Sequence, residues 1–149
     1  MGVVVDTSAL VAAERFAEKH PADGTTWNTW VGRMAAEPAV LPAAVYAELM
    51  VGVMLADTPE RAAGRRAKID ALTVNVPIVD FSPMIAEEWA RLFATLSRQG
   101  TMIPANDLAV AATARHLGYS VLVGPSDEAH FRRVPDVQIR TLTEEGLRL

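Results

Sequence analysis

The sequence predicts an α/β fold with a mostly parallel central sheet of about four to five strands and helices on both faces. Short β-branched runs alternate with longer segments of helical periodicity, and this alternation is typical of parallel sheets covered by helices. Capping residues and prolines separate the two kinds of segment. Half of the 149 residues are apolar, which is enough for the core of one domain spanning residues 1–149.

Each expected element begins or ends at a local signal. The first strand is the apolar run Gly2 to Val5, which has the character of a strand buried on both faces. Helix-capping residues precede the helices, and two of them are followed by a proline suited to the first helical position. The expected caps are Asp6, Thr25 or Thr26, Thr58, Ser82 and Asn106. The expected helices span about residues 8–19, 25–36, 42–56, 58–72, 82–99 and 106–117, and the expected strands span residues 2–5, 40–41, 76–79, 120–123 and 137–139.

Composition excludes several classes of protein. No apolar run approaches the roughly 20 residues of a membrane-spanning helix, and no signal peptide is evident, so we expect a cytoplasmic protein without a membrane partner. The chain has no cysteine, which excludes disulfides and thiolate metal sites. The net charge of −4 argues against bulk electrostatic binding of nucleic acid. It does not exclude an acidic metal site that acts on a phosphodiester, because bound cations reverse the local charge.

Three carboxylates stand alone in apolar segments that are expected to form the core. They are Asp6 within residues 1–13, Glu48 within residues 38–56 and Asp107 within residues 101–114. An ionised carboxylate in apolar surroundings is costly unless it is paired, and these segments contain no Lys, Arg or His. A shared divalent cation is the simplest partner, and oxygen ligands favour Mg²⁺ or Mn²⁺.

The expected elements allow the three acids to meet. Asp6 ends the first strand, at the edge where open α/β sheets bind ligands. Asp107 lies in the first turn of its helix on the apolar face, and Glu48 lies in the middle of an apolar helix. Asp6 is also explained as a helix cap, and Asp107 as an acid favoured by the helix dipole. Glu48 has no such structural explanation, so the three together favour a site.

The segments around these acids resemble the PIN-domain family, and more narrowly its VapC toxins. The resembling segments are Val-Val-Asp-Thr-Ser-Ala-Leu at 4–10, Tyr-Ala-Glu-Leu-Met-Val-Gly at 46–52 and Asn-Asp-Leu-Ala-Val-Ala-Ala-Thr-Ala at 106–114. The resemblance implies a three-layer PIN-like fold and a Mg²⁺- or Mn²⁺-dependent endoribonuclease, the toxin of a type II toxin–antitoxin pair. It also implies an RNA substrate, a VapB-type antitoxin and a homodimer. Asp6, Glu48 and Asp107 match the family's catalytic and metal-binding acids, with Thr7, Ser8 and Asn106 as supporting residues.

The family's fourth acidic position is ambiguous in residues 123–131. Counting back from Phe131 puts His130 where an aspartate often occurs and Glu128 two residues earlier. Counting forward from the preceding strand instead favours Ser126 or Asp127. Asp127 and Glu128 are therefore both candidates for a fourth ligand. The run from Ser126 to Glu128 is equally typical of the capped first turn of a short helix. His130 is either a contact to the substrate or a surface histidine, and the second interpretation is favoured.

Basic residues and alternative functions complete the expectations. The candidate contacts to the RNA backbone are Arg61, Arg65, Arg66, Arg132 and Arg133, although such clusters are more often solvated faces. The helices at 42–56 and 58–72 are joined by a turn and offer an antitoxin segment a groove beside Glu48. One alternative is a catalytically silent PIN domain that serves as a binding module. Another is a haloacid-dehalogenase-type phosphatase, which requires a second aspartate where this chain has Ser8.

Overall fold

The computed structural model describes residues 2–20, 27–34 and 36–143, and its centre is a parallel sheet. The strands are β1 (Val3–Val5), β2 (Ala39–Pro42), β3 (Ile78–Val79), β4 (Ser120–Val123) and β5 (Ile139–Thr141). They lie in the order β3-β2-β1-β4-β5, and every neighbouring pair is parallel. Val4 of the central strand pairs with Val40 on one side and Val121 on the other. The predicted fold class is therefore confirmed, with five strands.

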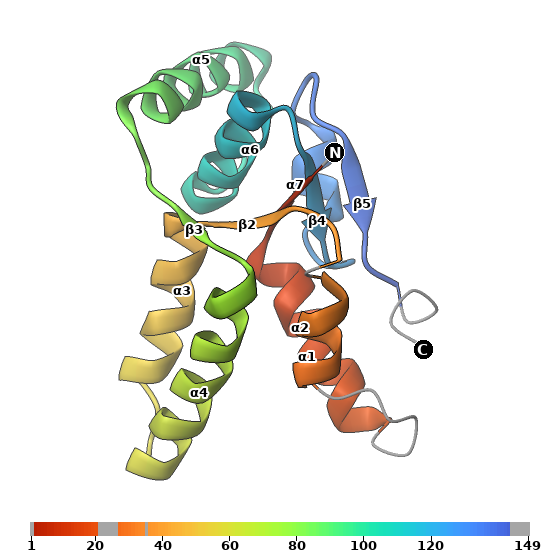
Figure 1. The fold of residues 1–149 in the computed structure, drawn as a ribbon. Helices are drawn as coiled ribbons and strands as arrows, with labels where there is room; N and C mark the ends of the chain where they lie inside the picture. Colours follow the sequence, from red (N-terminus) through yellow and green to blue (C-terminus); the bar gives the residue numbers. More distant parts are fainter. Residues whose placement is uncertain (1, 21–26, 35, 144–149) are drawn as a thin grey trace.

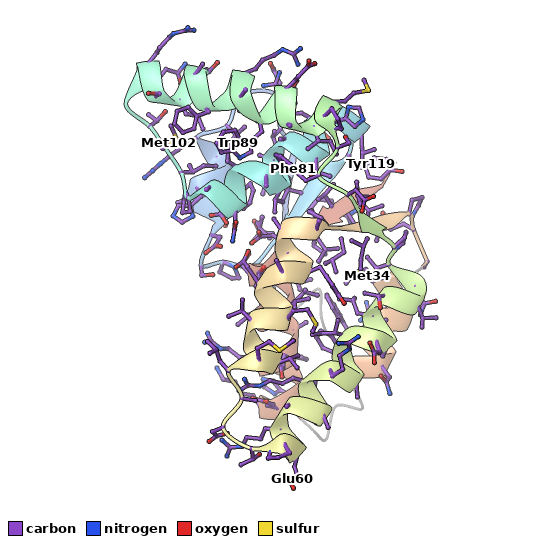
Figure 2. The ribbon with its side chains drawn as sticks, turned by 90° about the vertical axis from the view of Figure 1, so that its left-hand side faces the viewer. Met34, Glu60, Phe81, Trp89, Met102 and Tyr119 are labelled. Carbon is purple, nitrogen blue, oxygen red and sulfur yellow. The ribbon has the colours of Figure 1, made fainter. Side chains whose placement is uncertain are left out.

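Helices cover both faces of this sheet. They are α1 (Thr7–Lys19), α2 (Trp27–Met34), α3 (Ala43–Met54), α4 (Pro59–Asn75), α5 (Pro83–Gln99), α6 (Ala105–Leu117) and α7 (Glu128–Arg132). Figure 1 shows α5 and α6 on one side of the sheet and α1 and α2 on the other. Helices α3 and α4 run side by side away from the sheet, and Glu60 marks the tip of this pair in Figure 2. Within the described residues no helix is both long and apolar enough to span a membrane.

The core explains why the central elements are so apolar. Each residue of β1 is at most 1% exposed, because the strand is paired on both edges and covered on both faces. Helix α6 is buried from Asp107 to Ala114, since it lies between the sheet and α5. Its alanines let it approach both neighbours closely. A carboxylate at position 107 is therefore carried into the core by the helix itself.

Several predicted boundaries are wrong by a few residues. Helix α4 continues to Asn75, and Val76 closes it by donating its N–H to the Leu72 carbonyl, so β3 is shorter than the expected strand at 76–79. The last strand begins at Ile139 rather than 137, because Asp136 turns the chain with φ at 59°. Helix α2 ends at Met34, two residues early, and its expected cap at Thr25 or Thr26 lies outside the described residues.

The predicted role of Asn106 as a helix cap is wrong. Helix α6 begins one residue earlier, at Ala105, and the cap position is Pro104, which makes no side-chain hydrogen bond to the helix. Proline supplies the extended backbone that a helix start requires, with φ −56° and ψ 146°. Asn106 therefore lies in the first turn, where its side chain is available to another partner.

Candidate metal centre

Asp6 is positioned by the junction between β1 and α1. It caps α1 in an extended conformation and is 1% exposed. Its Oδ2 accepts hydrogen bonds from the Ser8 backbone N–H at 3.0 Å and from the Ser8 hydroxyl at 2.5 Å. Burial raises the pKa of Asp6, the two Ser8 hydrogen bonds oppose this rise, and repulsion by Asp127 adds to it. Asp6 is therefore both the expected helix cap and a buried acid at the carboxyl end of the central strand.

Ser8 joins the ends of the two central strands. Its hydroxyl donates to Asp6 and accepts from the Gly124 N–H at 2.9 Å, immediately after β4. A Cβ at Gly124 would lie only 2.3 Å from the Ser8 carbonyl oxygen, so this close approach requires glycine. The serine thus orients the Asp6 carboxylate and fixes where the chain leaves β4.

Asp107 is joined to His130 across the site. Asp107 is 8% exposed, and its Oδ2 lies 2.7 Å from His130 Nδ1. Burial raises the pKa of Asp107 to about 6; the His130 hydrogen bond opposes this rise, and repulsion by Asp6 and Asp127 adds to it. The prediction that His130 is a surface histidine is wrong, because α7 turns its ring, one-third exposed, toward α6.

Glu48 reaches the same region from the middle of α3. Burial is the main cause that raises its pKa, and Asp6 and Asp127 contribute by repulsion. The Thr7 hydroxyl and the Asn106 side chain partly offset that rise in pKa. The Thr7 Oγ1 atom lies near enough to Glu48 for this effect, yet it is buried without a partner of good hydrogen-bond geometry. Asn106 thus acts on Glu48 rather than on its own helix.

Asp127 and Glu128 have different surroundings. Asp127 raises the pKa of Asp6, Glu48 and Asp107, so its charge lies close to all three. Glu128 instead accepts from Arg132 Nε at 2.8 Å, and this pairing lowers the Glu128 pKa. The structure therefore brings Asp127 to the other acids and turns Glu128 toward the next helical turn.

The arrangement offers ligand atoms to a cation. Within the described residues, Asp107, Asp127 and His130 each present one such atom, and these atoms lie within 4.8 Å of one another. The charge of Asp6 acts on Asp107, and the charge of Asp127 acts on Glu48, so Asp6 and Glu48 both lie near these three residues. The Thr7 hydroxyl, which lies near Glu48 and has no hydrogen-bond partner, is a further oxygen. A set of carboxylates with one imidazole suits Mn²⁺ as well as Mg²⁺. The donor chemistry therefore fits a divalent metal.

The five basic residues proposed from the sequence make contacts of their own. Three of them form ion pairs: Arg61 with Asp57 at 2.9 Å, Arg66 with Asp70 at 3.1 Å, and Arg132 with Glu128. The other two donate to backbone carbonyls: Arg65 to that of Gly52 at 2.5 Å, and Arg133 to that of Met102 at 3.2 Å. All five of these contacts are solvent-exposed. Three of these arginines are thus partly neutralised by carboxylates one helical turn away.

Sequence reasoning did not assign His130 or Gly124 to the site. For His130 there was a signal, since counting back from Phe131 aligned it with a position that is often acidic. For Gly124 the only signal was a glycine directly after a buried strand, which is compatible with many turns.

Known proteins resemble this chain over most of its length. The family profile described as the PIN domain matches residues 3–137. The protein named Ribonuclease VapC4 from Mycobacterium tuberculosis is 34% identical over 95 residues, which cover 64% of this chain and 70% of that protein. Ribonuclease VapC1 from Rickettsia felis is 26% identical over 145 residues, covering 97% of this chain and 99% of the relative.

A solved structure shares the fold. The structure of VapBC2 from Rickettsia felis, bound to a DNA fragment from its promoter, aligns with a TM-score of 0.75 and 21% identity, covering 96% of this chain and 100% of the other. The family match over residues 3–137 spans the segments that contain Asp6, Glu48 and Asp107. The chain therefore belongs to the PIN-domain family, and within it to the VapC type.

Proposed function

We propose that this protein is a divalent-metal-dependent endoribonuclease that acts as the toxin of a type II toxin–antitoxin pair. The observation that carries the proposal is the convergence of three acids, of which Asp6 and Asp107 are buried and Glu48 is partly buried. Burial is the main cause that raises the pKa of each, and the charge of Asp127 adds to each rise. Such mutual repulsion is unfavourable for folding and useful for binding a cation. The ribonuclease names of the curated relatives support the same activity.

Asp107, Asp127 and His130 would hold the metal, with Asp6 and Glu48 completing its surroundings. When bound there, Mg²⁺ or Mn²⁺ supplies Lewis-acid polarisation of the phosphodiester and charge neutralisation. Phe131 of α7 is fully buried, which anchors the short helix that carries His130. The candidate ligands thus come from a helix start and a tethered turn rather than from loose surface segments.

The protein's own groups account for orientation and proton transfer. Ser8 holds the Asp6 carboxylate, and Thr7 and Asn106 lie close enough to Glu48 to lower its pKa. Burial raises the pKa of the Asp107 carboxyl in the metal-free protein to about 6. This carboxylate would accept a proton from the attacking water. The His130 ring, 2.7 Å away, keeps that carboxylate in one orientation. This assignment implies attack on phosphorus by water rather than by the ribose 2′-hydroxyl.

The decisive experiment is to express the protein and map new RNA 5′ ends across the transcriptome, with Asp6→Asn as the control. A few sharp cleavage sites in structured RNA, absent from the variant, are the expected result. Purified protein should cleave the same RNA when Mn²⁺ is present, and the cleavage should stop when EDTA is added. Identical profiles for wild type and variant would refute the nuclease and leave the silent binding module as the better interpretation.

A groove beside the acids is suited to an antitoxin segment. It has a volume of about 330 Å³ and adjoins Thr7 and Glu48. Its walls are mainly apolar, formed by Leu10, Val11, Trp27, Leu49, Ile69 and Leu72. The solved VapBC complexes support a VapB-type partner. An amphipathic segment of that partner would lay its apolar residues in the groove and direct a basic side chain to the acids.

The groove proposal has its own test. Leu49→Arg should weaken inhibition by the antitoxin, whereas Val74→Arg, at an 81% exposed position outside the groove, should not. Removing the C-terminal half of the antitoxin should likewise restore ribonuclease activity. Full inhibition after that deletion would show that the antitoxin acts elsewhere.

The proposed homodimer has a candidate surface at α5. Phe81 and Met84 are 49% and 64% exposed at the start of the helix, and Phe93 is 45% exposed. Trp89 stacks on Phe93 with ring centroids 5.2 Å apart, and Figure 2 shows Trp89 between α5 and α6. Sedimentation should give a dimer for wild type and a monomer for Phe93→Arg. A dimeric variant would place the contact on another face.

A further inference from the structure

We propose that a second pocket, on the other side of α1, binds the RNA backbone next to the scissile phosphodiester. This inference rests on the proposed ribonuclease function, whose substrate path it defines. The pocket has a volume of about 330 Å³ and is open to solvent. Its cationic members are Arg15 and Lys19, which the sequence reasoning did not connect with RNA.

The pocket is continuous with the acids. Ser8 lines it, and the hydroxyl of the same serine donates to Asp6 at 2.5 Å. Ser126 lines it from the opposite wall and donates to Asp127 Oδ1 at 3.2 Å. Two walls of the pocket are therefore also supports of the candidate metal centre. If the scissile phosphodiester of an RNA strand lies at the acids, the adjacent nucleotide of that strand would lie in this pocket.

The cations of the pocket are available to a ligand. Arg15 and Lys19 are exposed and one helical turn apart on α1, a rise of about 6 Å. Within residues 2–20, 27–34 and 36–143 neither of them makes an ion pair or a side-chain hydrogen bond. By contrast, the cations of the groove at Glu48 are already engaged: Lys68 binds Glu14 at 2.5 Å and Arg65 binds a backbone carbonyl.

Charge identifies the occupant as a polyanion. The protein carries a net charge of −4, and the acids repel any phosphate that approaches without a cation. Arg15 and Lys19 compensate that repulsion only for a ligand that reaches from the acids into the pocket. A ribose-phosphate strand is long enough to do so. The apolar side chain of Val11, which is 36% exposed, supplies a floor for a ribose or base without reading its identity.

The experiment measures binding without cleavage. A short fluorescein-labelled single-stranded RNA of mixed sequence is titrated in EDTA, with fluorescence anisotropy recorded over a series of KCl concentrations. The double variant Arg15→Ala/Lys19→Ala should bind about tenfold more weakly. The slope of log affinity against log salt should fall in magnitude by about 1.4, because each phosphate contact of a single strand contributes about 0.7.

Two controls separate this pocket from general charge effects. Arg98→Ala removes an exposed cation in the last turn of α5, and it should bind RNA as wild type does. The triple variant of Arg61, Arg65 and Arg66 to alanine tests the basic face of α4, and it should change the salt slope less than the pocket variant does. Thermal melts of all variants should coincide within a few degrees, because the altered side chains are exposed.

Several results would overturn the proposal. One is a pocket variant with wild-type affinity and slope, and another is a loss of binding confined to the triple variant, which would put the RNA on α4. A third is the absence of any RNA binding by the wild-type protein. Cleavage is measured separately with Mn²⁺, so a protein that binds through Arg15 and Lys19 but never cleaves would refute the nuclease and retain the pocket.

Discussion

Replacing Asp107 by asparagine should stabilise the metal-free protein at neutral pH. Asp107 is 8% exposed and is repelled by Asp6 and Asp127, and its pKa is raised from 3.8 to about 6. A rise of about two pKa units corresponds to about 3 kcal/mol of unfavourable free energy when the group is ionised in the folded state. Asparagine has nearly the shape of the protonated acid and carries no charge. The folded variant therefore avoids that cost.

The pH dependence of this effect has a definite sign. Between pH 3.8 and about 6 the folded wild type binds more protons than the unfolded chain, so its stability falls as the pH rises through this window. The advantage of the Asp107→Asn variant should be absent below about pH 4 and complete above about pH 6. A difference of about 1–3 kcal/mol raises the Tm of a chain of this length by about 2–12 °C.

The assay is urea unfolding of both proteins in EDTA at pH 4 and pH 7.5. Adding Mn²⁺ at pH 7.5 should stabilise the wild type far more than the variant, because the metal binds only the folded protein and the variant lacks one carboxylate. If the variant is less stable than the wild type at pH 7.5 without metal, the repulsion argument is refuted. An equal advantage at pH 4 would refute it as well.

Three further predictions concern the same site. His130→Asp should shift the ratio of Mn²⁺ to Mg²⁺ affinity toward Mg²⁺ by about tenfold in calorimetric titrations, because an imidazole ligand favours Mn²⁺; an unchanged ratio would exclude His130 as a ligand. Gly124→Ala should lower the free energy of unfolding by about 1–3 kcal/mol through its clash with Ser8, whereas Gly64→Ala, which has open space in α4, should raise it by about 0.5–1 kcal/mol in the same urea experiment. RNA products should carry 5′-phosphate and 3′-hydroxyl ends in end-labelling assays, and 2′,3′-cyclic phosphates would rule out attack by water.

Local sequence was sufficient to predict most of the fold. The alternation of β-branched runs with capped helical segments predicted the parallel sheet, because each element carries its own signal at its boundaries. The wrong boundaries lie where contacts with other parts of the fold, rather than the local sequence, determine the conformation. Val76 has strong strand propensity, yet it closes α4 because its buried side chain and its N–H both have partners there.

The acids were easier to predict than their surroundings. The burial of Asp6 and Asp107 follows from the apolar segments that contain them, and the structure confirms that burial. The contact of His130 with Asp107 depends on how a five-residue helix is turned, which no local pattern specifies. The carboxylate partners of Arg61, Arg66 and Arg132 were visible in the sequence as acids four residues away, a spacing that favours ion pairs.

The hydrogen bond between Ser8 and Gly124 joins positions 116 residues apart, and this separation has a consequence for the timing of synthesis. A ribosome adds residues from the N-terminus at about 5–20 per second, so β1 and Asp6 exist long before β4. Asp107, Asp127 and His130 are likewise translated late. An unfinished chain has its first acid but neither the neighbours that orient it nor the other ligands. The growing polypeptide therefore lacks the assembled cluster of acids until its final fifth has been synthesised.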